Sequence, residues 1–155
     1  GVWYDEAEGV FKLWYRSGEW EHDGRKGLYT SYAISKDGKH WEKPALDVVP
    51  GTNVCDTIEH DSRSIWFDKQ ETDPSKRYKS VYSRCGKDKI KYDLRYSADG
   101  IHWGDTKALS GRICDRSTVT YNPFRKKWIA SIRVFLAILF WSITVIPLFY
   151  NSAIQ

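Results

Sequence analysis

The sequence predicts an all-β fold, a partial β-propeller of about two and a half four-stranded antiparallel blades with an apolar C-terminal tail. Three observations support this prediction. Aromatic residues make up 15% of the 155 residues, and β-strands favour aromatic side chains. The phrase Ser-x-Asp-Gly-x-His-Trp occurs twice, at 35–41 and at 97–103. Aromatic hairpin patterns recur around these two motifs, which indicates a repeated sheet module.

Each module is expected to begin with a β-hairpin. Segments 2–18, 65–84 and 119–133 each contain an apolar and aromatic strand, a turn opened by Asp or Asn, and a second strand of alternating polarity. The side chain that opens the turn can hydrogen-bond to the backbone two residues further on. These turn-opening residues are Asp5, Asp68 and Asn122. The alternation in the second strand places apolar and polar side chains on opposite faces of the sheet.

In the first two modules a third strand follows, at 28–35 and 91–97, and leads into the repeated motif. An Asp-Gly pair favours a tight hairpin turn, because glycine accepts a positive φ and the aspartate can cap the turn. We expect a short outer strand after this turn, which ends at Trp41 or Trp103. Each of these tryptophans is expected to pack between neighbouring sheets, and the histidine before it to form a structural hydrogen bond.

The predicted propeller segment comprises residues 1–133, and an apolar tail comprises residues 134–155. All 24 Lys and Arg and all 20 Asp and Glu lie before position 134. Three interpretations of the tail stay open: a foreign or frame-shifted segment, a membrane anchor through residues 134–150, or a buried strand pair of the same domain. As an anchor, 134–150 has about the minimum length for a spanning helix. The absence of Met, even at position 1, also predicts a missing upstream segment.

Composition and motifs exclude several function classes. The net charge of +4 comes from interspersed charges of both signs, whereas nucleic acid selects a one-signed basic surface. The three cysteines show no metal-ligand spacing, so we expect no metal site and no cofactor. The sequence contains no Gly-rich phosphate loop and no G-x-S-x-G nucleophile elbow. Nucleotide-dependent and serine hydrolase chemistry therefore have no support.

The segments 1–19, 32–53, 60–83, 94–105 and 115–133 resemble the five-bladed β-propeller glycoside hydrolases of the family 32 and 43 type, especially their bacterial relatives. The resemblance implies hydrolysis of glycosidic bonds in oligo- or polysaccharides. It also implies an axial funnel lined by three acidic residues from successive blades. One acid would act as nucleophile or base, one as general acid, and one would orient the sugar. The first of the three would lie before Gly1.

Two segments of this sequence match each other where the funnel acids are expected. In "HDSRSIWFD" and "CDRSTVTYN", Asp61 and Asp115 each stand seven residues before the turn-opening residue. We therefore select Asp61 and Asp115 as candidate catalytic acids. The alternative is that Asp56 or Glu59 faces the ligand, because "NVCDT" also resembles "RICDR". A purely structural role, such as an ion pair with an arginine between blades, is also open for each acid.

Further candidates for carbohydrate contact lie beside these acids or in polar loops. An arginine close to each acid could hold it ionised or bind a sugar hydroxyl or carboxylate, and a tryptophan in a charged loop has no obvious core to fill. The predicted substrate-binding residues are Arg63, Arg116, His60, Asn53, Glu59 and Trp20. The alternative function is a non-catalytic glycan-binding propeller, with a membrane tether as a further option. The predicted location is extracellular, periplasmic or membrane-associated, and the sequence leaves the oligomeric state open.

Overall fold

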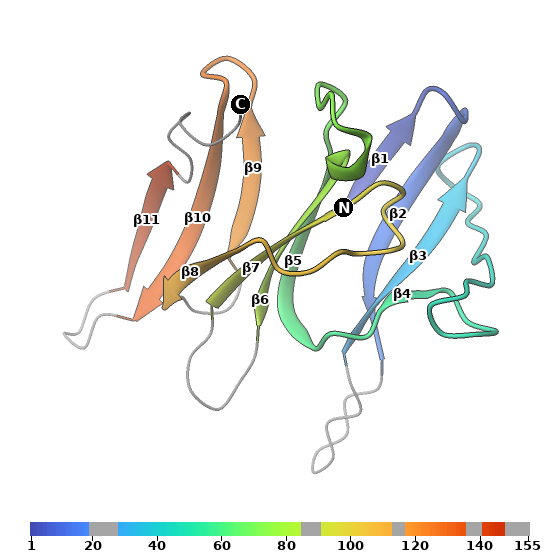
Figure 1. Ribbon diagram of the computed structural model, residues 1–155, viewed down its shortest axis with the longest axis horizontal. Coiled ribbons are helices and arrows are strands. Elements are labelled where there is room, and N and C mark those ends of the chain that lie inside the picture. Colours follow the sequence, from blue (N-terminus) through green and yellow to red (C-terminus); the bar gives the residue numbers. More distant parts are fainter. Residues whose placement is uncertain (19–27, 85–90, 113–116, 136–140, 148–155) are drawn as a thin grey trace, which may run out of the picture.

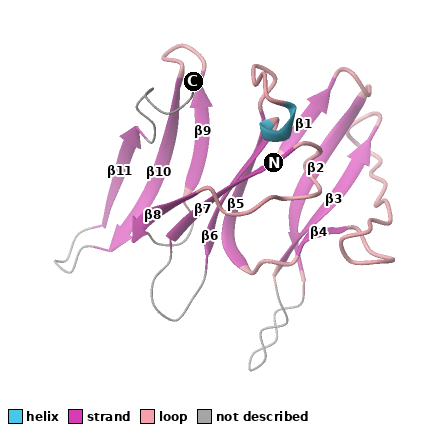
Figure 2. Cartoon of the chain, viewed as in Figure 1, coloured by secondary structure: helices cyan, strands magenta, loops and turns pink. Residues whose placement is uncertain are grey.

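A computed structural model of the chain describes residues 1–18, 28–84, 91–112, 117–135 and 141–147. The described part is built from strands, with one short 3-10 helix, η1 (Pro74–Lys76). The strands form three antiparallel sheets that follow one another along the chain and across the molecule (Figures 1 and 2). The predicted all-β partial propeller is therefore confirmed.

We call the three sheets blades 1, 2 and 3. Blade 1 contains β1 (Val2–Asp5), β2 (Val10–Ser17), β3 (Tyr29–Ser35) and β4 (Val54–Asp56). Blade 2 contains β5 (His60–Phe67), β6 (Tyr78–Arg84), β7 (Lys91–Ser97) and β8 (Ala108–Arg112). Blade 3 contains β9 (Thr118–Asn122), β10 (Lys127–Phe135) and β11 (Trp141–Pro147). Strands that are consecutive in the chain are neighbours in each sheet, so each blade is a meander.

The first strands of successive blades lie next to one another. Between blades 1 and 2, the indole Nε1 of Trp3 donates a hydrogen bond to the carbonyl oxygen of Ile65 at 2.8 Å. Between blades 2 and 3, the backbone N–H of Val119 donates to Ser64 Oγ at 3.2 Å. Strands β1, β5 and β9 therefore take the inner positions that surround the axis of a propeller.

The predicted turn chemistry is present in the first hairpins. Asp5 Oδ1 accepts a hydrogen bond from the backbone N–H of Ala7 at 3.0 Å. In blade 3, Asn122 Oδ1 accepts from the backbone N–H of Phe124 at the same distance. In blades 1 and 2 a lysine of the second strand also pairs with the turn aspartate at 2.9 Å, as Lys12–Asp5 and Lys79–Asp68.

The two Asp-Gly motifs form the same turn. In the first motif, Asp37 Oδ1 accepts the backbone N–H groups of Lys39 and His40, each at 2.8 Å, and its Oδ2 lies 2.7 Å from His40 Nδ1. The second motif repeats these three contacts at the same distances around Asp99. The two glycines have φ values of 74° and 79°. The predicted capping aspartates and structural histidines are therefore confirmed.

The predicted outer strand is misplaced, because no strand ends at Trp41 or Trp103. After the first motif the chain forms two isolated bridges, Ile34–Glu42 and Leu46–Thr52, and the fourth strands are β4 and β8, further along the chain. The physical reason is the turn itself. The aspartate of the turn accepts hydrogen bonds from two consecutive backbone N–H groups. These N–H groups are then unavailable for the hydrogen bonds between strands that would continue a tight hairpin.

The main hydrophobic core lies between blades 1 and 2. Its buried members are Trp14, Tyr32, Cys55, Ile65, Phe67 and Tyr78. The partly buried Trp103 packs against this cluster, as predicted for a tryptophan between sheets. Trp14 also donates a hydrogen bond through Nε1 to the carbonyl oxygen of Gly100 at 2.7 Å. This hydrogen bond connects the second Asp-Gly turn, which follows β7 of blade 2, to β2 of blade 1.

A second buried cluster joins blades 2 and 3. It contains Tyr92, Val119, Ala130 and Ile132. Strand β10 continues past position 133, and β11 pairs with it in a register from Ile129–Pro147 to Phe135–Trp141. Among the described residues no helix is both long enough and apolar enough to span a membrane. The division at residue 133 and a membrane contact through residues 134–150 stay predictions.

Candidate functional site

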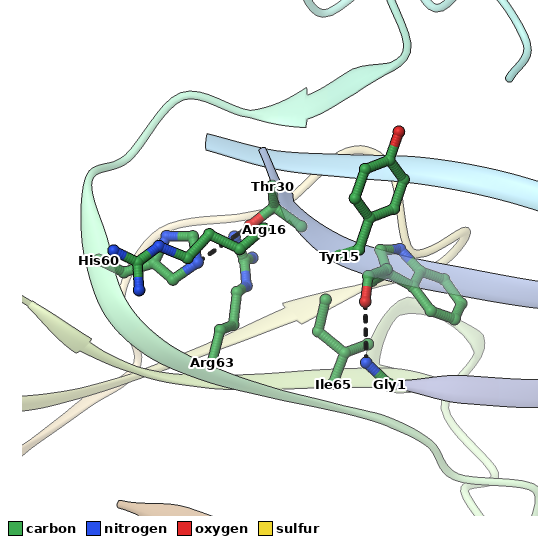
Figure 3. Close-up of a pocket in the computed structure, with 8 residues that line it drawn as sticks. Gly1, Tyr15, Arg16, Thr30, His60, Arg63 and Ile65 are labelled. Carbon is green, nitrogen blue, oxygen red and sulfur yellow. Dashed lines mark hydrogen bonds between the residues drawn. The ribbon is translucent and has the colours of Figure 1, made fainter. Parts of the chain in front are cut away.

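The candidate site lies where the inner strand of blade 2 begins. Strand β5 starts at His60, and Asp61 follows within the strand. A cavity of about 70 Å³ separates this part of β5 from blade 1 (Figure 3). Its walls come from β2, β3, β5 and the residue before β1, and they contain Gly1, Trp14, Tyr15, Arg16, Thr30, His60, Arg63 and Ile65.

Arg63 holds the centre of this site and is almost fully buried, with a side chain that is 4% exposed. Its Nε donates to Ser80 Oγ at 2.7 Å. Its Nη1 donates to Thr30 Oγ1 at 2.9 Å and to Asp56 Oδ2 at 2.8 Å. Burial lowers the pKa of Arg63, and the charge of Asp56 opposes this effect. These contacts fix the guanidinium in one position between the two blades.

The Arg63 guanidinium lies over two aromatic rings. Its central carbon lies 5.2 Å from the ring centre of Tyr82 and 4.9 Å from that of Trp103. Both distances are within the range of cation–π contacts. Trp103 belongs to the second Asp-Gly motif, so this motif also forms part of the wall around the buried charge.

Asp56 ends β4 and pairs with two arginines of blade 2. Its Oδ2 accepts from Arg63 and also from Arg95 Nη1, the latter at 3.2 Å. Its Oδ1 accepts the backbone N–H of Ile58 at 2.9 Å. The side chain is 6% exposed. The structure therefore places this alternative acid in an ion-pair network between blades, where its oxygens are already occupied.

His60 is buried and forms a directed chain of hydrogen bonds with Thr30 and Arg63. The ring Nδ1 lies 2.9 Å from the carbonyl oxygen of Ile58, which can only accept, so Nδ1 carries a proton. Nε2 lies 3.5 Å from Thr30 Oγ1. Because Thr30 Oγ1 accepts from Arg63, its own proton is free for Nε2 of a neutral imidazole. Burial lowers the pKa of His60, and the charge of Arg63 lowers it further.

This burial of a neutral imidazole predicts acid sensitivity. The pKa of His60 is lower in the folded protein than its usual value near 6.5, so the unfolded chain binds the proton more readily. The stabilisation is present above about pH 6.5 and is lost as the pH falls through the folded-state pKa. We expect the urea midpoint of unfolding to drop between pH 7.5 and pH 5.5, and to drop less in His60→Gln.

His102 provides the control for this pH experiment. It is largely exposed, and the pKa of His102 is raised by hydrogen bonds to Asp99 and Asp47. Its contribution therefore has the opposite sign, being present at low pH and lost as the pH rises through the folded-state pKa. His102→Gln should not flatten the acid dependence. An equal pH slope in wild type and His60→Gln would contradict the assignment.

The remaining predicted site residues fall into two groups. Among those that are described, Asn53 contacts two other strands of blade 1. Its Nδ2 donates to Tyr15 Oη in β2 at 2.8 Å and to the carbonyl oxygen of Tyr32 in β3 at 2.7 Å. Glu59 is half-buried. Asp61 lies in β5 where the pairing with β6 changes register, and its side chain is outside the described part. Outside the described residues altogether lie Trp20, Asp115 and Arg116.

Sequence reasoning missed several residues of this site, and two of them carry its polar contacts between blades. Thr30 relays the contact between Arg63 and His60, and Arg95 is the second partner of Asp56. Strand alternation places Thr30 and Arg95 on a face of their own blade but gives no pairing across blades. Within the described residues no group of three or more His, Cys, Asp or Glu could hold a metal ion.

No family model matches the sequence, and no curated protein sequence matches it either. Among solved structures, the fructofuranosidase of Schwanniomyces occidentalis complexed with fructose superposes with a TM-score of 0.60 at 18% identity. This match covers 86% of the present chain and 28% of the enzyme. The chain is similar in fold to part of that enzyme.

Two further complexes of the Schwanniomyces fructofuranosidase agree with this result. An amino-acid-substituted form with fructosylnystose gives a TM-score of 0.60 at 19% identity, and the complex with fructosyl-erythritol gives 0.57 at 17%. Coverage is again 86% of this chain and 28% of the other. The present chain thus spans a little more than a quarter of the length of these fructofuranosidases, and the likeness is one of fold.

Proposed function

We propose that this chain is part of a glycoside hydrolase-like propeller that hydrolyses glycosidic bonds in oligo- or polysaccharides. The observation that carries the proposal is the fold likeness to fructofuranosidase structures that hold fructose and fructosyl compounds. The order of the inner strands supports it. Asp61 lies near the start of β5, and Asp115 precedes β9, which neighbours β5. On this proposal the two acids stand before or at the start of adjacent inner strands and act on one sugar.

Two such carboxyl groups can divide the work of hydrolysis. One protonates the glycosidic oxygen, and the other attacks the anomeric carbon or activates water as the oxocarbenium-like transition state forms. A carboxyl separation of about 5 Å leads to retention and one of about 6.5–9.5 Å to inversion. Arg63 contributes a fixed positive charge two residues from Asp61, because its hydrogen bonds to Asp56, Thr30 and Ser80 prevent it from turning away.

The decisive experiment compares kcat between the wild-type protein and variants of the two candidate acids. It uses the protein at the length that the source organism produces. We expect Asp61→Asn and Asp115→Asn each to lower kcat on sucrose or a fructo-oligosaccharide by about 10²–10⁴-fold, the usual effect of losing a general acid or base. Asp105→Asn, at an exposed position, is the matched control and should keep full activity. Unchanged kcat in both variants would refute the assignment of the acids.

A non-catalytic glycan-binding propeller is the second candidate. It is favoured by Asp56, a buried acid of this site, which is engaged in arginine pairs between blades. In that case a fructo-oligosaccharide should bind without release of reducing sugar. Affinity measured by calorimetry would then be the same in wild type and in both acid variants. Hydrolysis by the wild-type protein would exclude this candidate.

A further inference from the structure

Another cavity lies at the opposite end of the inner strands from Asp61. It has a volume of about 210 Å³ and is lined by residues of all three blades. Asp61 is the second residue of β5, whereas Trp66 and Phe67, which line this cavity, are its last two. Trp66 therefore lies roughly 17 Å along the strand from Asp61, at about 3.4 Å per residue. Figure 1 shows the turns that follow β1, β5 and β9 at this one end of the molecule.

Aromatic rings from three adjacent inner strands line this cavity. Trp3 belongs to β1, Trp66 to β5 and Tyr121 to β9, and all three are partly buried. Trp66 meets the rings of Trp3 and Tyr121 at interplanar angles of 65° and 63°. Rings that meet at such angles are held in place without stacking on one another. The cluster therefore offers a ligand a fixed apolar surface.

Polar groups follow these rings on the loop after β5. Asp68 Oδ2 pairs with Lys79 at 2.9 Å, and Asp68 Oδ1 accepts the backbone N–H of Gln70 at 3.1 Å. These contacts fix the carboxylate, and each of its oxygens keeps a lone pair for a further donor. Gln70 is exposed and also lines the cavity, and its amide both donates and accepts. The loop therefore provides partners for hydroxyl groups.

The charged side chains at the cavity favour a neutral ligand. Asp68 and Lys69 both line the cavity. Asp68 is paired with Lys79, which also bonds to Glu71, and Lys69 is paired with Glu6 at 2.6 Å. Because each of these two side chains already has a partner of opposite sign, neither is a lone charge that would select an ion.

The size of the cavity limits how much of a ligand it holds. Pockets that enclose a drug-sized ligand measure about 300–1,000 Å³, and the volume here is about 210 Å³. This space is suited to one ring of a chain molecule whose other rings lie outside. A sugar ring has a face of C–H groups, which packs on the electron-rich face of an aromatic ring, and an edge of hydroxyl groups. An oligosaccharide therefore matches both the aromatic wall and the polar loop.

We propose that this cavity binds one ring of a neutral oligosaccharide. The C–H face of the ring lies on Trp66 and Tyr121, and its hydroxyl groups bond to Asp68 and Gln70. The site does not depend on hydrolysis by the candidate acids, which are placed at the other end of the inner strands. A protein that cleaves no glycan can still hold one here.

Binding of xylohexaose and of an inulin-type fructohexaose, measured by calorimetry, tests this site. The measurement uses the protein at the length that the source organism produces, with Asp61→Asn and Asp115→Asn combined so that neither probe is consumed. We expect saturable binding of at least one probe, weakened about 10-fold in Tyr121→Leu, the size of one aromatic contact. Equal affinity with and without Tyr121→Leu would overturn the proposal.

Tyr4→Leu is the matched control for Tyr121→Leu. Tyr4 and Tyr121 each stand directly before the turn-opening residue of a first hairpin, Asp5 or Asn122, but Tyr121 lines the cavity and Tyr4 contacts Phe11 of its own blade. Tyr4→Leu should therefore leave the affinity unchanged. An equal loss of affinity in the two variants would contradict the site.

Two milder variants separate binding from folding. Tyr121→Phe keeps the ring and should bind within about twofold of the parent protein, since the packing surface is retained. Gln70→Ala, at an exposed position, should keep the melting temperature but weaken binding several-fold, because a hydroxyl partner is lost. Full affinity in Gln70→Ala would contradict the role given to the loop.

A proline-rich peptide is the competing occupant, because such peptides also bind aromatic grooves. A polyproline peptide is therefore titrated beside the two oligosaccharides. Binding of the peptide that is lost in Tyr121→Leu, with no binding of either oligosaccharide, would overturn the proposal. Saturation-transfer NMR gives the positive result: irradiation of aromatic protein protons should reach the C–H protons of the bound oligosaccharide in the parent protein and reach them far less in Tyr121→Leu. The kcat of the acid variants decides the hydrolysis proposal separately.

Discussion

Replacing Asp56 by Ala should lower the free energy of unfolding by about 3–5 kcal/mol, the usual cost of removing one partner from a buried ion pair. Asp56 is the shared acceptor of two guanidinium groups, and its side chain and that of Arg63 are 6% and 4% exposed. Without the carboxylate, both cations stay buried and uncompensated. Urea unfolding followed by tryptophan fluorescence measures the loss.

Two comparisons make this prediction specific. Arg63→Gln should cost less than Asp56→Ala, because Asp56 keeps Arg95 as a partner. Lys69→Ala breaks an exposed ion pair, in which the side chain of Lys69 is 45% exposed and that of Glu6 is 65% exposed. Exposed pairs contribute about 0–1 kcal/mol to stability. If Asp56→Ala and Lys69→Ala lowered the free energy of unfolding by the same small amount, the Asp56 network would not be what holds blades 1 and 2 together.

The repeated parts of the fold could be predicted because they depend on local chemistry. The turn at Asp5 follows from a carboxylate that reaches backbone N–H groups two and three residues away. The turns at Asp37 and Asp99 follow from the same kind of contact. Each of these interactions is contained within a few consecutive residues, so the sequence alone carries it. The outer strand was misplaced because its partner N–H groups are used inside the turn.

The contacts between blades could not be predicted in the same way. Asp56 and Arg95 are 39 positions apart, and their contact requires β4 of one blade to face β7 of the next. The sequence indicated Arg63 as a partner for Asp61, two residues away. In the structure Arg63 bonds to Asp56 across the connection between β4 and β5. Repeat alignment identifies equivalent positions within blades, whereas the distance between blades decides which charges meet.

Gly38 and Gly100, the glycines of the two Asp-Gly motifs, form a matched pair for measuring how the second motif packs against blade 1. A methyl group at Gly100 would lie 2.5 Å from Cζ2 of Trp14 and 3.1 Å from a ring carbon of Tyr78. At Gly38 the nearest atoms belong to Phe11 of the same blade, at 3.6 Å, which is ordinary contact. Both backbones have positive φ, at 79° and 74°. Substitution by Ala therefore strains both backbones alike, and only Gly100→Ala adds a clash.

We expect Gly38→Ala to lower the free energy of unfolding by about 1–2 kcal/mol, the strain of a left-handed backbone in a residue with a Cβ. Gly100→Ala should lose about 1–3 kcal/mol more, the cost of overpacking a tight core. The added loss arises because Trp14 is held by its hydrogen bond to the Gly100 carbonyl and cannot retreat. Urea unfolding of both variants gives the difference directly.

A double-mutant cycle assigns this difference to Trp14. In a Trp14→Leu background the ring that meets the new methyl group is absent, so Gly100→Ala should cost no more than Gly38→Ala. The remaining loss is then the backbone strain that both turns share. Should Gly100→Ala stay the costlier change in that background, the clash would have to lie at Tyr78 instead. Should the two glycine variants be equal already in wild type, the second Asp-Gly turn would not be seated on blade 1, and the packing of these two blades would differ from the one described.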